Sequence, residues 1–168
     1  MARKGVLAMT AASIATVLVI GGMLPSAAQE VPPPIATEFL TDRAVFTDDV
    51  EFLIRNKREG ATGVVRVDDP SRTVVARFTV QAGAQFPWHS HAGPVIVNVT
   101  QGTLTYVEAA DCDATEYPAG TAFVDPGHGH VHSAFNPTGG ETVLVATFFE
   151  APEVGQLLIL AEPADCPI

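Results

Sequence analysis

"FPWHSHAGPVIVNVTQG" (residues 86–102) and, further along the chain, "DPGHGHVHSAFN" (residues 125–136) together hold all five histidines of the sequence. A neutral imidazole is a good metal ligand that titrates near physiological pH. In the first stretch His89 and His91 point to the same face of a strand, because strand side chains alternate with a period of two. One such pair is weak support for a metal site, and a second histidine-rich stretch strengthens it.

The second stretch repeats the pattern in "HGHVH". If a strand begins near Gly129, His130 and His132 share one face and His128 lies in the preceding turn. Antiparallel strands can bring histidines from both stretches to one point. A shared ion with bonds of ~2.1 Å requires the His132 ring to lie within about 6 Å of the first pair of rings.

Short strand-like segments surround both stretches. "RTVVARFTV" (residues 72–80) alternates between two faces, as a strand with one buried side does. The residues expected on its buried face are Val74, Ala76, Phe78 and Val80. "PVIVNVT", "GTLTYVEA", "GTAFVD", "HVHSAFN" and "ETVLVATFF" follow, separated by turn sequences such as "YPAG" and "NPTGG". The pattern predicts an all-β sandwich or barrel of antiparallel strands.

The spacing of these residues resembles the cupin superfamily. Its first motif runs glycine, five residues, H-x-H, three or four residues, glutamate, six residues, glycine. The matching positions are Gly83, His89, His91, Val95 in place of the glutamate, and Gly102. Its second motif runs glycine, five residues, proline, one residue, glycine, two residues, histidine, three residues, asparagine. The matching positions are Gly120, Pro126, Gly129, His132 and Asn136, with one extra residue between proline and glycine.

The resemblance covers residues 73–149 and implies a single jelly-roll barrel of six to eight strands with a metal inside. Carried over by position, it makes His89, His91 and His132 the metal ligands. The expected organisation is a signal peptide at residues 1–28, an N-terminal extension of undefined structure at 29–60, the cupin barrel at 61–160 and a C-terminal tail at 161–168.

Two departures from the family pattern leave three alternatives open. Val95 cannot bind a metal, and the extra residue brings His128 and His130 near the second motif. The site is then a neutral triad of histidines, similar to cupins related to cysteine and diketone dioxygenases. Alternatively, His130 or His128 is an additional ligand. In the third alternative the pocket has lost its metal, and the histidines bind a ligand by hydrogen bonds.

Three neutral imidazoles leave a divalent ion its full charge, which favours an anionic substrate at the open positions. Imidazole suits Fe, Zn, Ni and Cu alike, so the ligand residues do not show which of these metals, or Mn, is bound. We therefore expect a mononuclear metalloenzyme for a small oxygenated or anionic molecule, with dioxygenase chemistry as the first hypothesis. The alternative function is a non-catalytic cupin module that binds a small molecule or a metal ion.

The first residues combine basic Arg3 and Lys4, an apolar run to Leu24 and small residues Ser26 and Ala28, which is typical of a secretory signal cut after Ala28. An uncleaved membrane anchor is the alternative. We expect an exported protein with no further membrane segment. The formal net charge of −10 makes nucleic acid an improbable partner, and a homodimer is an option that the resemblance offers.

Cys112 and Cys166 are the only cysteines. Export and an even count permit a disulfide between them, and free thiols are the alternative. They stand in separate loop-like contexts, so a structural zinc site built on them is not expected.

Overall fold

The computed structural model describes residues 34–58, 61–67, 70 and 72–168, and all regular secondary structure in this part is β. The predicted signal peptide lies outside the described residues. No helix among the described residues is long and apolar enough to cross a membrane. The strands are β1 (Ile35–Val45), β2 (Phe52–Arg58), β3 (Ala61–Val67), β4 (Arg72–Val80), β5 (His89–Ser90), β6 (Val95–Gln101), β7 (Thr103–Glu108), β8 (Ala114–Pro118), β9 (Ala122–Asp125), β10 (His132–Phe135), β11 (Thr142–Phe148) and β12 (Ile159–Leu160).

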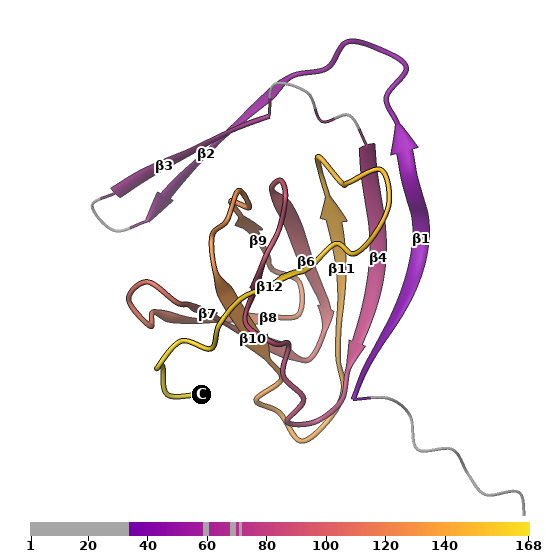
Figure 1. The fold of residues 1–168 in the computed structure, drawn as a ribbon. Helices are drawn as coiled ribbons and strands as arrows, with labels where there is room; N and C mark the ends of the chain where they lie inside the picture. Colours follow the sequence, from indigo (N-terminus) through magenta and orange to yellow (C-terminus); the bar gives the residue numbers. More distant parts are fainter. Residues whose placement is uncertain (1–33, 59–60, 68–69, 71) are drawn as a thin grey trace, which may run out of the picture. The chain divides into compact units, whose positions relative to one another are not determined.

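Two five-stranded antiparallel sheets form the barrel (Figure 1). One sheet has the strand order β1-β4-β11-β6-β9, and the other has the order β12-β5-β10-β7-β8. β5 and β10 are neighbours although they are distant in sequence, so the two histidine-rich stretches can meet. The expectation of a single all-β jelly-roll barrel is confirmed.

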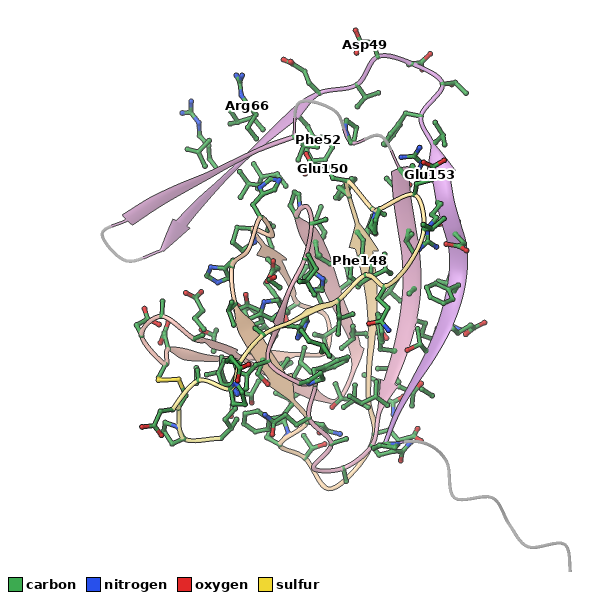
Figure 2. The ribbon with its side chains drawn as sticks, viewed as in Figure 1. Asp49, Phe52, Arg66, Phe148, Glu150 and Glu153 are labelled. Carbon is green, nitrogen blue, oxygen red and sulfur yellow. A yellow bond between two sulfur atoms is a disulfide. The ribbon has the colours of Figure 1, made fainter. Side chains whose placement is uncertain are left out.

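The core lies between the sheets because their strands alternate in burial. On β4 the predicted inward face is buried, whereas Arg77 on the opposite face is exposed. β11 alternates in the same way, and its last residue, Phe148, packs in the core (Figure 2). The rings of Phe78, Phe86 and Phe148 meet edge to face at centroid distances of 5.7 and 6.3 Å. Such pairs contribute beyond the area that they bury.

The segment that the sequence left undefined contributes strands. β1 pairs with β4 along the edge of the first sheet, from Ile35 opposite Val80 to Val45 opposite Arg72. β2 and β3 form a separate two-stranded hairpin. The Phe52 ring of this hairpin contacts the Phe149 ring at 4.7 Å. The ordered structure therefore extends on the N-terminal side of residue 61.

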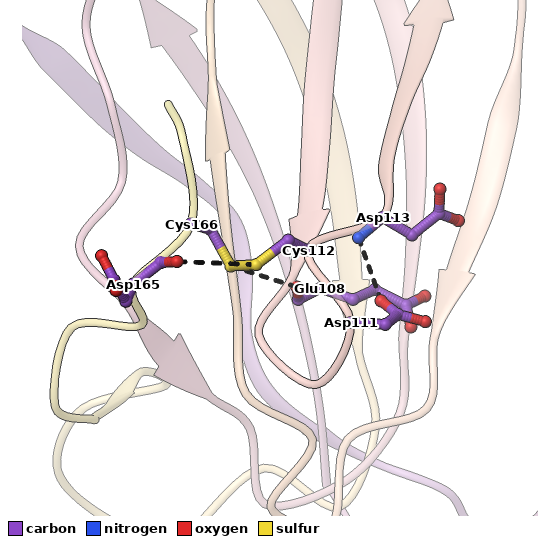
Figure 3. The surroundings of a disulfide bond; sticks show 6 residues. All are labelled: Glu108, Asp111, Cys112, Asp113, Asp165 and Cys166. Atoms are coloured by element: carbon purple, nitrogen blue, oxygen red, sulfur yellow. Dashed lines mark hydrogen bonds between the residues drawn. A yellow bond between two sulfur atoms is a disulfide. The ribbon is translucent and has the colours of Figure 1, made fainter.

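The C-terminal segment is tied to the barrel in two ways. β12 pairs with β5, with Leu160 opposite His89. Beyond it, Cys166 forms a disulfide with Cys112, which lies in the loop between β7 and β8 (Figure 3). Of the two alternatives left by the sequence, the structure forms the disulfide.

Asn136, the last residue of the second cupin motif, holds the turn that leads into β11. It is fully buried, and its amide nitrogen donates hydrogen bonds to the carbonyls of Val80 at 2.9 Å and Gly140 at 2.7 Å. Its side-chain oxygen accepts hydrogen bonds from the backbone N–H and the hydroxyl of Thr138.

Replacing Asn136 with alanine should destabilise the fold by about 2–3 kcal/mol, because buried carbonyls lose their donors. Urea unfolding of the whole chain measures the change. As a control, Thr100→Ala removes one exposed side-chain hydrogen bond and should cost about 1 kcal/mol or less. Equal effects of the two substitutions would contradict this role of Asn136.

Candidate metal centre

Strand pairing brings the two histidine-rich stretches together. β5 and β10 are antiparallel neighbours, and His132 is the direct cross-strand partner of His89. His91 follows β5 by one residue, and its ring turns towards the same point. All three side chains are buried, with exposed fractions of 4–6 %.

The three rings meet the distance that one shared ion requires. The centroid of His132 lies 4.2 Å from that of His89 and 5.2 Å from that of His91, and the first pair is 4.8 Å apart. One nitrogen from each ring can be chosen so that the three atoms lie within 4.8 Å of one another. The predicted convergence of these histidines is confirmed, and the group is compatible with a metal ion.

Each ring has one nitrogen occupied by an oxygen acceptor. His89 Nδ1 lies 2.6 Å from the Pro87 carbonyl, and His91 Nδ1 lies 2.9 Å from the Leu157 carbonyl. His132 Nδ1 lies 2.8 Å from Asp125 Oδ2. An Nδ1–H donated to these oxygens leaves Nε2 of all three rings with a free lone pair. Metal-binding histidines have this arrangement.

Burial keeps the first histidine pair neutral. Desolvation, with the electrostatic effect of His132, lowers the pKa of His89 from 6.5 to about 3, although the hydrogen bond to Pro87 opposes the shift. Desolvation likewise lowers the pKa of His91. Neutral imidazole is the form that binds metals, so these rings are ready to coordinate at neutral pH without first losing a proton.

Asp125 is a member of the site that sequence reasoning missed. An aspartate before a proline turn ordinarily binds the backbone of that turn, and this bond exists, from the Gly127 N–H to Oδ1 at 2.6 Å. In addition, Oδ2 accepts a hydrogen bond from the Tyr106 hydroxyl at 2.7 Å and lies against His132. Its only sequence signal was an acidic residue directly before the motif proline.

The Asp125 side chain remains ionised despite its burial. Desolvation raises its pKa, but the hydrogen bond from His132 and the electrostatic effect of this ring, with contributions from His91 and Tyr106, outweigh desolvation and lower the pKa to about 2. A carboxylate that accepts three hydrogen bonds generally has a lowered pKa, because the bonds stabilise its ionised form.

Val95 occupies the position of the family glutamate and takes no part in coordination. It is 2 % exposed and belongs to the hydrophobic core. Its cross-strand partner in the pairing of β6 with β9 is Asp125. A carboxylate therefore stands directly opposite the position where the family pattern places one.

The other two histidines lie outside the group of three. β10 begins at His132, so the expectation of a strand from about Gly129 is wrong, and His130 belongs to the preceding turn. His130 Nε2 lies 3.8 Å from Glu108 Oε2. His128 is exposed, and its Nε2 lies 2.6 Å from Glu150 Oε2 at the end of β11 (Figure 2). Among the described residues, the metal-capable group contains neither ring.

A small, largely apolar cavity of about 50 Å³ adjoins the three rings. The cavity therefore has room for a small molecule or a fragment of one. Apart from the histidines, its ionisable lining residues are Asp125 and Tyr106. The apolar lining residues include Phe78, Phe86, Val97, Leu104, Phe148 and Leu158. Trp88, next to the first ligand, is buried and is not among the residues that line the cavity.

The donor set fits a borderline transition-metal ion. Three imidazoles suit Zn, Fe, Ni or Cu, and their hydrogen bonds to fixed oxygens orient the rings. These three residues would hold the ion, and an ion with three protein ligands would keep a position for a further ligand, as catalytic sites do.

The metal-free protein should lose stability in acid. A histidine whose pKa is lower in the folded state binds fewer protons when folded, so stability falls as the pH drops below the unfolded value. For His89 and His91 this loss begins near pH 6.5, and for His89 it continues to about pH 3. Asp125 adds a loss below about pH 4, because its pKa is also lowered.

We expect the melting temperature of the metal-free protein to fall by on the order of 5–10 °C between pH 7 and pH 4.5. The profile of a His89→Gln variant should be flatter than that of the wild type. A wild-type melting temperature that is constant over this range would refute the assignment of buried, neutral rings.

The ChrR cupin-like domain family matches residues 40–149 of the chain, which is more than half of its length. No curated protein sequence matches the chain.

Similar solved structures include KdgF from Halomonas sp., at 18 % identity and a TM-score of 0.48, covering 74 % of this chain and 88 % of that one. A cupin-2 domain protein from Shewanella frigidimarina NCIMB 400 has 22 % identity and a TM-score of 0.40, with coverage of 46 % and 71 %. A cupin-like protein from Thermotoga maritima MSB8 has 30 % identity and a TM-score of 0.41, with coverage of 45 % and 55 %. The match over residues 40–149 identifies the chain as a member of the ChrR cupin-like domain family, within the cupin superfamily that its histidine motifs predicted.

Proposed function

We propose that this protein binds one divalent transition-metal ion through His89, His91 and His132 and uses the open coordination positions to bind and transform a small molecule. The observation that carries the proposal is the shared orientation of three buried rings. Each has Nδ1 against an oxygen acceptor and Nε2 available. Polar groups that only hydrogen-bond a ligand would not need all three rings fixed in the same tautomer.

The cavity narrows the class of ligand. Its volume of about 50 Å³ allows a small ligand, and most of its lining is apolar. The ion contributes two positive charges and Asp125 one negative charge, so the site as a whole favours a ligand with one negative group. A small carboxylate or enolate with a short apolar body satisfies these conditions.

Oxygen-dependent cleavage is the reaction class that we propose first. When bound, the ion supplies Lewis acidity and, in the case of iron, one-electron redox chemistry. The chain supplies the neutral face of imidazoles and the apolar walls. Phe148 and Leu158 are among the apolar side chains that line the cavity. Apolar surroundings strengthen the attraction between a bound ion and an anionic ligand.

A non-catalytic binding module is the second candidate, and two observations favour it. Val95 removes the family carboxylate, and the cavity is small for a substrate with a second reactant. In that case the same three histidines hold an ion or a small ligand without chemistry.

We also propose that the protein is exported. The predicted signal at residues 1–28 is the first support, and the disulfide between Cys112 and Cys166 is the second, because such bonds persist in oxidising compartments.

Metal binding is tested on the mature protein reconstituted without oxygen with Fe(II), Mn(II) or Zn(II). We expect one ion per chain. His91→Ala should weaken Zn(II) binding by at least ~100-fold, since it removes a ligand. His128→Ala is the matched control, because this histidine lies outside the group, and should leave binding unchanged. No bound metal after reconstitution with any of the three ions would overturn the proposal.

Catalysis is tested by oxygen consumption of the Fe(II)-loaded protein with a panel of thiols, diketones and phenols. The enzyme hypothesis predicts turnover that is lost in His132→Ala. If both proteins are inert while a ligand still raises the melting temperature of the wild type, the binding module is the correct function.

A further inference from the structure

We propose that Asp125 is a positioning residue for the metal centre: its carboxylate fixes the His132 ring in the tautomer that presents Nε2 to the ion. Val95 stands where cupins have a carboxylate ligand, and the carboxylate of Asp125 lies on the neighbouring strand. It contacts a ligand, His132, instead of binding the metal itself. This inference rests on the proposed metal site, and its test separates the two.

The position of Asp125 follows from strand register. It is the last residue of β9 and pairs with Val95, the first residue of β6. Directly paired residues of antiparallel strands point to the same face, so a side chain at 125 reaches the interior beside the one at 95. Val95 packs in the core and lines the cavity together with Asp125, and of the two only Asp125 brings a carboxylate.

The contact with His132 decides the tautomer. Asp125 Oδ2 lies 2.8 Å from His132 Nδ1, at the distance of a charge-assisted hydrogen bond. The His130 carbonyl is a second neighbour of the same nitrogen, but at 3.3 Å and without charge. An ionised carboxylate only accepts hydrogen bonds, so Nδ1 carries the proton and Nε2 keeps its lone pair.

Asp125 lies outside the group of ligands, and its oxygens bind other partners. Oδ2 already accepts from Tyr106 and His132, and Oδ1 accepts from the Gly127 N–H. The metal-capable group of described residues contains the three histidines alone. Asp125 therefore acts on the ion through His132.

The turn after β9 holds the carboxylate in place. Gly127 adopts a φ of +63°, and a side chain there would collide with the Gly93 carbonyl, since its Cβ would lie 2.0 Å from that oxygen. Only glycine allows the turn to pack this closely. The Tyr106 ring stacks on the His132 ring at 4.8 Å while its hydroxyl binds the same carboxylate oxygen. The ring and its acceptor are thus fixed together.

Asp125→Asn tests the proposal because an amide cannot replace both carboxylate oxygens. If its oxygen accepts from Gly127, its NH₂ group faces His132 Nδ1 and favours the tautomer with the proton on Nε2. If its oxygen faces His132, two donors meet at Gly127. Either orientation disturbs the arrangement that the wild type fixes.

The matched control is Asp111→Asn. Asp111 Oδ1 accepts the Asp113 N–H at 3.0 Å, the same turn contact that Asp125 makes with Gly127 (Figure 3). It is exposed, and it does not belong to the metal-capable group of described residues. The substitution therefore removes the same charge and alters the same kind of turn.

The experiment uses the mature chain with its disulfide intact. Zn(II) affinity is measured by competition with a chromophoric chelator, and the tautomer of His132 in the metal-free protein is measured by long-range ¹H–¹⁵N NMR at pH 7.5. We expect Asp125→Asn to weaken Zn(II) binding by about 10–100-fold. We also expect it to shift His132 away from the Nδ1–H tautomer that the wild type shows. Asp111→Asn should match the wild type in both measurements.

The inference is overturned if Asp125→Asn binds Zn(II) within about two-fold of the wild type and keeps the Nδ1–H tautomer. Metal binding itself would then stand. If instead the wild type binds no metal while its His132 tautomer depends on Asp125, the proposed function fails and the positioning role stands. Should Asp125→Asn not fold, the wild-type spectrum decides, because an Nε2–H tautomer at His132 contradicts the proposal and an Nδ1–H tautomer supports it.

Discussion

The pairing of β5 with β10 is the constraint on which the candidate site depends. These short strands place His89 directly opposite His132, although more than forty residues separate them in sequence. The pairing is held from both sides, by β12 against β5 and by β7 against β10. A shift of one residue in this register would turn one ring of the pair away from the cavity, because side chains alternate along a strand.

The surroundings of the three rings come from distant parts of the chain. The acceptor for His91 is the carbonyl of Leu157, in a segment that β12 and the Cys112–Cys166 disulfide hold against the barrel. The acceptor for His132 is Asp125, on the edge strand of the other sheet. The orientation of the ligands thus depends on the closure of the whole barrel, and the two sheets are coupled through the site.

Sequence alone supplied the fold class, the inward face of β4 and the three histidines that converge. These features are local, or belong to motifs with fixed spacing. It did not supply the role of Asp125 or the acceptor of His91, because both depend on pairings between segments far apart in the chain. The expected start of β10 near Gly129 was wrong because the turn continues to His130, whose N–H donates to the Gly127 carbonyl. Strand β1 was missed because its exposed pattern on a sheet edge shows no clean alternation.

The central claim is that three imidazoles, each through Nε2, share one ion inside the barrel. X-ray absorption spectroscopy of the Zn(II)-loaded wild-type protein tests it most directly, since it reports the number and distance of imidazole ligands. The account predicts three imidazole nitrogens at ~2.0–2.1 Å from the zinc, with the remaining coordination position filled by one further oxygen or nitrogen donor. A shell of oxygen atoms alone, or one with a single imidazole, would contradict it.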